Sequence, residues 1–197
     1  SFTMYNGSIE NNSANEGGGV YLVSSTFDMH SGTITGNTAN EDGGGVGILE
    51  SIFHLYDGTI SENKVSGNSS CGGGVYVGAG DGKTSSFFMH KGSITGNSAY
   101  AFLGGGVFVQ VRGIFTMESG TISGNRAGHG GGVDVDGTFN MLGGTITNNN
   151  ASGIDNAKGE GGGVRVQGKL VVSGVVKITG NKSGARLSAG VYKDGTD

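Results

Sequence analysis

An internal repeat dominates this chain. A phenylalanine, a glycine five residues later and an isoleucine two residues after that recur six times, starting at Phe2, Phe27, Phe53, Phe87, Phe115 and Phe139. A degenerate seventh copy starts at Leu170 and reaches Ile178 one residue late. The copies lie 24 to 34 residues apart, yet the spacing inside the motif is constant in the first six. We therefore expect the fixed segments to stack and the variable ones to loop outward.

Two more residue patterns follow each isoleucine. An asparagine stands three residues later, at Asn12, Asn37, Asn63, Asn97, Asn125, Asn149 and Asn181. Three glycines and a valine come next, at 17–20, 43–46, 72–75, 104–107, 130–133 and 161–164, with a weakened copy at 189–191. We expect the asparagines to form a ladder whose amides bond to one another and to turn backbone. The glycines should occupy positions where a Cβ would clash or where φ is unusual.

Apolar residues alternate within the fixed segments, as in Phe87 and Met89 or Val107 and Val109. Alternation with period two indicates strands with one buried face. Helical periodicity is absent, and 44 glycines in 197 residues would penalise helices. A coil of about 24 residues has room for three short strands, and successive coils would pair in parallel with a right-handed crossover. The sequence therefore predicts an all-β fold: a right-handed parallel β-helix solenoid of about seven coils, forming one domain over residues 1–197.

Composition excludes several classes of function. The 12 Lys and Arg residues are outnumbered by 16 Asp and Glu residues, which argues against a nucleic-acid surface. No apolar run is long enough for a membrane-spanning helix, and the single Cys71 rules out an intramolecular disulfide. His30 and His90 occupy equivalent positions two coils apart, so no metal site is predicted, and no motif indicates a cofactor.

Because neither end shows a polar cap, we expect a segment of a longer protein, with end-to-end association as one possibility.

The combined motif Phe-x-Met-x-x-Gly-x-Ile-x-x-Asn-x-Ala and Gly-Gly-Gly-Val-x-Val resembles the repeats of bacterial cell-surface β-helix proteins. These include adhesin-like proteins and the polymorphic outer-membrane protein group with autotransporter passengers. The resemblance covers nearly the whole chain. It implies a secreted or surface-displayed, non-enzymatic module for adhesion or surface structure, and it carries over no catalytic residue.

One outward column is the first candidate binding surface. It consists of the residue between the paired valines of each coil: Tyr21, Gly47, Tyr76, Phe108, Asp134, Arg165 and Tyr192. Exposed aromatic rings beside a charged pair would suit sugar rings of a host or matrix glycan, or a protein partner. The alternative is a ladder of strand-favouring residues with one surface ion pair worth less than about 1 kcal/mol.

Hydroxyl side chains flank each inward isoleucine and form the second candidate surface. They are Thr33, Thr35, Thr59, Ser61, Ser93, Thr95, Thr121, Ser123, Thr145 and Thr147. Stacked in two columns, they would be similar to the ice-binding faces of insect-type β-helix antifreeze proteins. The alternative is that threonine simply suits exposed strand positions and pairs with itself.

A carbohydrate-active enzyme is the third hypothesis. Asp134 and Asp136 would share one strand face about 7 Å apart, a spacing that suits paired carboxylates. The alternative is an ordinary pair of solvated acids. A non-enzymatic extracellular module is therefore the leading prediction, with ice binding and carbohydrate chemistry as the alternatives.

Overall fold

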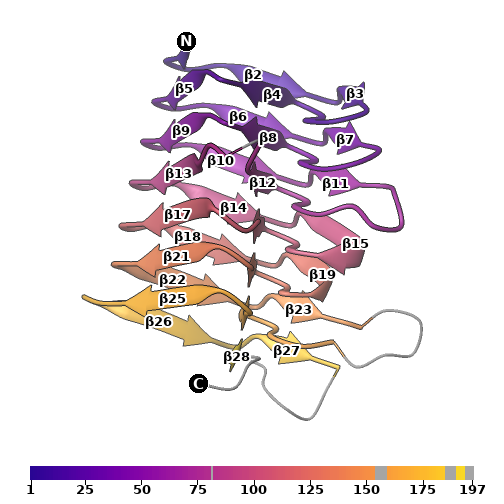
Figure 1. Ribbon diagram of the computed structural model, residues 1–197, viewed down its shortest axis with the longest axis vertical. Coiled ribbons are helices and arrows are strands. Elements are labelled where there is room, and N and C mark those ends of the chain that lie inside the picture. Colours follow the sequence, from indigo (N-terminus) through magenta and orange to yellow (C-terminus); the bar gives the residue numbers. More distant parts are fainter. Residues whose placement is uncertain (81, 154–158, 185–189, 194–197) are drawn as a thin grey trace.

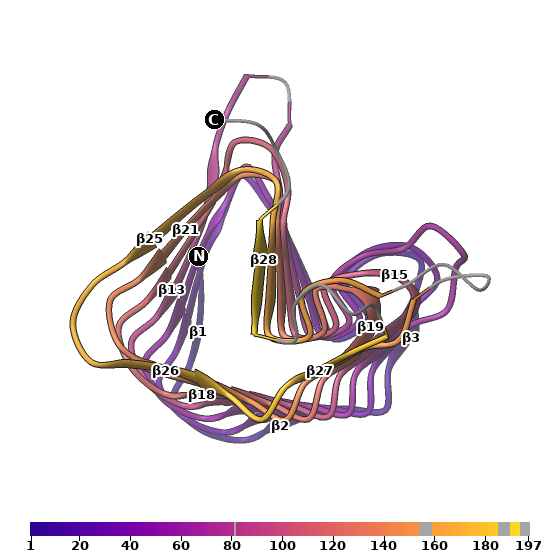
Figure 2. The ribbon, with the colours of Figure 1, turned by 90° about the horizontal axis from the view of Figure 1, so that it is seen from below.

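The computed structural model describes residues 1–80, 82–153, 159–184 and 190–193, so Ala189 of the weakened last motif lies outside it. Every regular element in the described part is a β-strand, and the strands form four parallel seven-stranded sheets (Figure 1). Seen from the C-terminal end, the chain runs counterclockwise through the sheets as it advances toward the viewer (Figure 2). This confirms the right-handed parallel β-helix, with about six full turns against the seven coils predicted.

Each coil contributes one strand to each sheet. Sheet A holds β1 (Phe2–Met4), β5 (Thr26–Met29), β9 (Ile52–Leu55), β13 (Ser85–Met89), β17 (Gly113–Met117), β21 (Thr138–Met141) and β25 (Lys169–Val172). Sheet B holds β2 (Ser8–Glu10), β6 (Thr33–Thr35), β10 (Thr59–Ser61), β14 (Ser93–Thr95), β18 (Thr121–Ser123), β22 (Gly144–Thr147) and β26 (Val176–Thr179). Sheet C holds β3 (Ser13–Ala14), β7 (Thr38–Ala39), β11 (Lys64–Val65), β15 (Ser98–Leu103), β19 (Arg126–His129), β23 (Asn150–Ala151) and β27 (Lys182–Ser183). Sheet D holds β4 (Val20–Val23), β8 (Val46–Leu49), β12 (Val75–Gly78), β16 (Val107–Val109), β20 (Val133–Val135), β24 (Val164–Val166) and β28 (Val191–Lys193).

The expectation of three strands per coil is wrong, because each coil has a fourth strand in sheet C. Several of these strands, such as β7 and β23, have only two residues, which is too short for a visible alternation. In Figure 2 sheet C belongs to a side lobe beside the main barrel. The lobe has a small core of its own, made of Ala39, Val65, Ala99 and Ala127.

Sheets A, B and D enclose the main core. Their inward residues pair like with like, so that Phe87 lies between Phe53 and Phe115, and Ile94 between Ile60 and Ile122. Successive phenylalanine rings stack at centroid distances of 4.6 to 4.9 Å. Burial of one such side chain contributes about 1.5–3 kcal/mol. The apolar ladders therefore stabilise the solenoid along its whole length.

The asparagine ladder is confirmed at the corner between sheets B and C. The Asn97 Oδ1 accepts hydrogen bonds from the backbone N–H and the Nδ2 of Asn63, both at 3.0 Å. The Asn97 Nδ2 in turn donates to the Ile60 carbonyl and to the Asn125 Oδ1, both at 3.0 Å. The pattern recurs from Asn12 to Asn181, and from Asn37 onward the side chains are buried, so a polar column holds the coils in register.

The glycine triplets occupy positions of unusual φ or close backbone approach, as expected. The first glycine of each triplet has a positive φ, such as 71° at Gly43. The second lies against backbone: a Cβ on Gly131 would lie 2.5 Å from the Asn150 carbonyl carbon and 2.6 Å from the Gly162 oxygen. Only glycine fits this turn, where the lobe rejoins the main barrel.

Candidate functional site

The predicted binding column runs down sheet D in the expected register, but its middle is not exposed. Tyr76 pairs with Phe108, Phe108 with Asp134, and Asp134 with Arg165. Phe108 is 5%, Asp134 0% and Arg165 7% exposed, so the expectation of an open aromatic and charged surface is wrong for these three. The cause is the turn of the glycine triplet, which covers this face. Gly130, for example, lies so close that a Cβ there would be 2.5 Å from the Asp134 Cβ.

The Asp134–Arg165 pair is a buried, bidentate ion pair and not the weak surface ion pair that the alternative interpretation expected. Arg165 Nε donates to Asp134 Oδ2 at 2.8 Å, and Arg165 Nη2 donates to Asp134 Oδ1 at 3.0 Å. Loss of hydration raises the pKa of Asp134 to about 6, because it outweighs the attraction of the guanidinium. Both Asp134 oxygens face Arg165, so Asp134 is not the free half of a carboxylate pair with Asp136. The pair locks neighbouring coils together.

The aromatic end of the column also packs inward. Tyr76 is half-buried near Asp42, and the Asp42 Oδ1 accepts the Cys71 backbone N–H at 2.7 Å. Burial raises the pKa of the Cys71 thiol far above its usual range, so this cysteine is a poor nucleophile. Tyr21 stays 42% exposed, and Tyr192 is half-buried. Tyr21 is therefore the one aromatic residue of this column that presents a large open surface.

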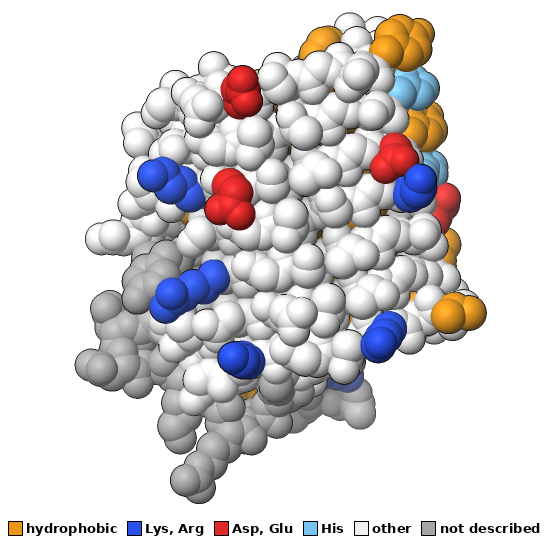
Figure 3. All heavy atoms as spheres, turned by 180° about the vertical axis from the view of Figure 1, so that it is seen from behind, with side chains coloured by type: hydrophobic (Ala, Val, Ile, Leu, Met, Phe, Trp, Pro, Cys, Tyr) orange, Lys and Arg blue, Asp and Glu red, His pale blue; other side chains and the backbone are white. Residues whose placement is uncertain are grey.

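The ten hydroxyl side chains of sheet B lie in register, as predicted. All are half-buried, and neighbours hydrogen-bond across coils: Thr59 with Ser93 at 3.1 Å, and Thr95 with Ser123 at 3.3 Å. Figure 3 shows this face as a largely uncharged surface with acidic and basic side chains scattered over it. The predicted array therefore exists, although part of its hydrogen-bonding capacity is satisfied internally.

A cluster of six rings, which was not predicted from the sequence, lies at the corner between sheets A and B. Tyr5, His30, Tyr56 and His90 stack in one column at centroid distances of 4.8 to 5.0 Å. In Figure 3 orange and pale-blue side chains alternate down this edge. His54 and Phe88 form a second row on sheet A, with their centroids 4.9 Å apart. The signal was present, because the third residue after the repeat phenylalanine reads Tyr, His, Tyr, His in the first four copies.

Two histidines that the sequence placed in different columns touch within this cluster. His54 Nδ1 lies 3.2 Å from His90 Nε2, and His90 Nδ1 lies 2.9 Å from Glu118 Oε2. The His54–His90 centroid distance of 5.4 Å is close to that nitrogen–nitrogen distance plus two ring radii. Both nitrogens therefore lie almost on the line between the centroids, and the hydrogen bond is in plane. Partial burial lowers the pKa of His54.

A shallow groove of about 580 Å³, which we call the corner groove, runs across four coils beside the ring column. Its floor is built from the repeat glycines Gly58, Gly92, Gly120 and Gly144. Thr59, Ser93, Thr121 and Thr145 of sheet B line one side, and Asp57, Lys91 and Ser119 line the other. Lys91 Nζ lies 2.9 Å from Asp57 Oδ2, so the charged side chains of the groove neutralise each other.

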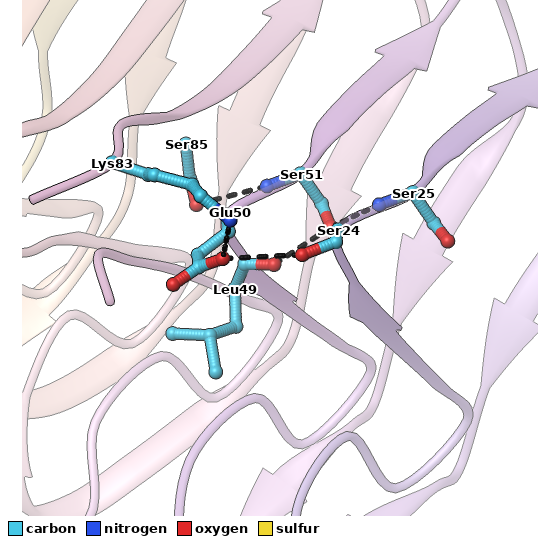
Figure 4. A network of polar contacts seen from close by, with 7 residues as sticks. All are labelled: Ser24, Ser25, Leu49, Glu50, Ser51, Lys83 and Ser85. Carbon is cyan, nitrogen blue, oxygen red and sulfur yellow. Dashed lines mark hydrogen bonds and ion pairs between the residues drawn. The ribbon is translucent and has the colours of Figure 1, made fainter. Parts of the chain in front are cut away.

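The corner between sheets D and A carries a polar network of its own (Figure 4). Serine side chains bridge successive coils there: the Ser25 backbone N–H donates to Ser51 Oγ at 2.9 Å, and the Ser51 N–H donates to Ser85 Oγ at 3.3 Å. Lys83 Nζ lies 2.7 Å from Glu50 Oε2, which also accepts the Ser24 hydroxyl. Both charged groups in the network, Lys83 and Glu50, have a partner, so the network stabilises the corner.

The fold and surfaces together define a parallel β-solenoid with a largely uncharged hydroxyl face and a shallow groove at the corner that carries the ring column. Among the described residues, no helix has the length and apolar character needed to cross a membrane. No group of three or more His, Cys, Asp or Glu side chains in that part of the chain is arranged to hold a metal ion. Comparison of the chain with protein-family models, curated proteins and solved structures gives no match. The parallel β-solenoid that the resemblance implies is confirmed, and the relation to bacterial surface proteins stays a prediction.

Proposed function

We propose that this chain is a non-enzymatic extracellular module for adhesion or surface architecture, and that it contacts glycans. The observation that supports this most is that two sets of residues have different roles in each coil. The repeated phenylalanine, isoleucine, asparagine and glycine residues all build core and corners. The side chains between them stand in straight columns on a rigid scaffold, which suits repeated contacts with a partner.

The chemistry of the open faces favours polyhydroxylated partners. The sheet B face and the corner groove offer mainly hydroxyls, with Asp57 and Lys91 as a neutralised pair. A hydroxyl both donates and accepts hydrogen bonds, which matches the hydroxyls of a sugar. A surface of this kind has little to attract a polyanion.

An array of defined oligosaccharides tests the proposal, with the folded chain as the probe and heat-unfolded chain as control. We expect binding that depends on folding. If no sugar on the array binds, a purely architectural role is the remaining interpretation. Release of reducing ends from a bound sugar would support a carbohydrate-active enzyme instead. Extracellular location is tested by protease treatment of intact cells that carry the native gene. End-to-end association stays a prediction, tested by light scattering against concentration.

Ice binding is the second candidate, and the in-register hydroxyl columns of sheet B favour it. Thermal hysteresis at high protein concentration is the test. If the face binds ice, Thr121→Lys at its centre should abolish hysteresis, while Tyr21→Ala on sheet D should not. Absence of ice shaping by the wild type would remove this candidate.

A further inference from the structure

The corner groove has the shape and chemistry of a binding site for a linear chain. It follows the coil axis across β10, β14, β18 and β22, and adjacent strands lie about 4.8 Å apart. The groove thus spans about 14 Å, enough for a short oligomer. Its two sides differ: hydroxyls line one, and Asp57, Lys91 and Ser119 line the other. Tyr56 and His90 of the ring column directly precede Asp57 and Lys91 in the chain, at the same corner, and we take these two rings as the rim of that side.

The backbone of the groove is already satisfied, which argues against an extended peptide as the occupant. The Gly58, Gly92 and Gly120 carbonyls accept hydrogen bonds from the backbone N–H groups of Ser93, Thr121 and Thr145 in the next coil, at 2.9 to 3.1 Å. A peptide strand binds a sheet through free backbone groups at an edge. Here a ligand must bond to side-chain hydroxyls, which favours a partner rich in hydroxyls.

The rings on the rim are held in place before any ligand arrives. Both His90 nitrogens are engaged, one by Glu118 and one by His54, and the ring stacks on Tyr56 at 4.8 Å. Tyr56 is packed between His30 and His90 but remains 39% exposed. A rigid, partly open aromatic surface loses little conformational entropy on binding. Such surfaces give sugar rings apolar contact, while polar groups nearby fix their orientation.

We infer that the corner groove binds a short linear run of uncharged sugars, with Tyr56 and His90 as its apolar rim and Thr59, Ser93 and Thr121 as its hydrogen-bonding wall. This inference rests on the proposed contact with glycans and names the site and the class of glycan. The Asp57–Lys91 pair leaves the groove without net charge, so acidic sugars gain nothing there. His90 acts through its ring and not through a free nitrogen.

The test uses an array of neutral, amino and acidic oligosaccharides of two to six units, followed by calorimetric titration with the best binder. We expect neutral sugars to bind the wild type. Tyr56→Ala and Thr121→Val should each weaken binding about tenfold, equivalent to about 1.4 kcal/mol. Tyr21→Ala is the matched control, because Tyr21 has similar exposure (42% against 39%) but lies on sheet D. His90→Phe should bind nearly as well as wild type, whereas His90→Ala should not.

Unchanged melting temperatures show that each variant is folded. If the wild type binds sugars and Tyr56→Ala and Thr121→Val bind equally well, the groove assignment is overturned while the proposed function stands. Preference for acidic sugars also overturns it, and so does a loss confined to Tyr21→Ala. A wild type silent toward every sugar removes both the groove site and the proposed glycan contact.

Discussion

Replacing Asn97 by alanine tests the ladder that holds the coils in register. The side chain takes part in four hydrogen bonds, each at 3.0 Å, with Asn63, Ile60 and Asn125. Its removal leaves two Asn63 donors, the backbone N–H and one Nδ2 hydrogen, without their acceptor. Asn63 and Asn97 are both 1% exposed, so water does not reach these donors in the folded chain.

A buried donor without a partner costs about 1–3 kcal/mol, so the two donors predict a loss of about 2–6 kcal/mol. A domain has about 5–15 kcal/mol in total, so the change would be a large part of the free energy of unfolding. Urea denaturation followed by circular dichroism measures it. Asn140→Ala is the control, because Asn140 is half-buried and makes a single bond of 3.4 Å to Thr116. A loss at Asn97 no greater than at Asn140 would refute the reasoning.

Three further perturbations test other parts of the structure. Gly131→Val should lower the free energy of unfolding by about 3 kcal/mol or more, since its side chain meets backbone. Gly82→Ala has nothing within 4 Å and should cost only the strain of its φ of 83°, about 1–2 kcal/mol. Equal melting temperatures of the two variants would contradict the packed turn. Arg165→Met should cost about 3–5 kcal/mol by leaving Asp134 buried and unpaired, and Asp134→Leu combined with it should restore most of that loss, which calorimetry would show or deny. Because the folded-state pKa of Asp134 is raised to about 6, the folded chain binds more protons there than the unfolded chain between pH 4 and 6. Stability should therefore fall by about 3 kcal/mol as pH rises through that window, and a denaturation series in which Asp134→Asn shows the same slope would disprove this origin.

The sequence predicts the solenoid well because its constraint is local and repeated. The fixed spacing from Phe87 to Gly92 to Ile94 admits one stacked arrangement, and in the structure these residues lie in register with their counterparts. The asparagine ladder follows from the same spacing. The fourth strand escaped prediction because two residues, as in β7, give no alternation to detect.

The candidate sites were less predictable, for a physical reason. Alternation shows that Asp134 points away from the barrel core, but it does not show that the glycine-triplet turn lies over that face. Whether a second segment buries Asp134 depends on the path by which the chain returns from the lobe to the main barrel. The His54–His90 contact was missed because it runs diagonally, between the first residue after one phenylalanine and the third after the next. The repeat pattern predicts which side chains lie in register in adjacent coils, but it does not predict diagonal contacts.

The central claim is that each copy of the motif makes one turn and places like residues over like. Nuclear Overhauser contacts between selectively labelled isoleucine methyl groups test it most directly. The account predicts a chain of cross-peaks in the order Ile34, Ile60, Ile94, Ile122, Ile146, each linking residues one coil apart. Cross-peaks in another order, or none between these buried side chains, would contradict the stacked solenoid and every surface built on it.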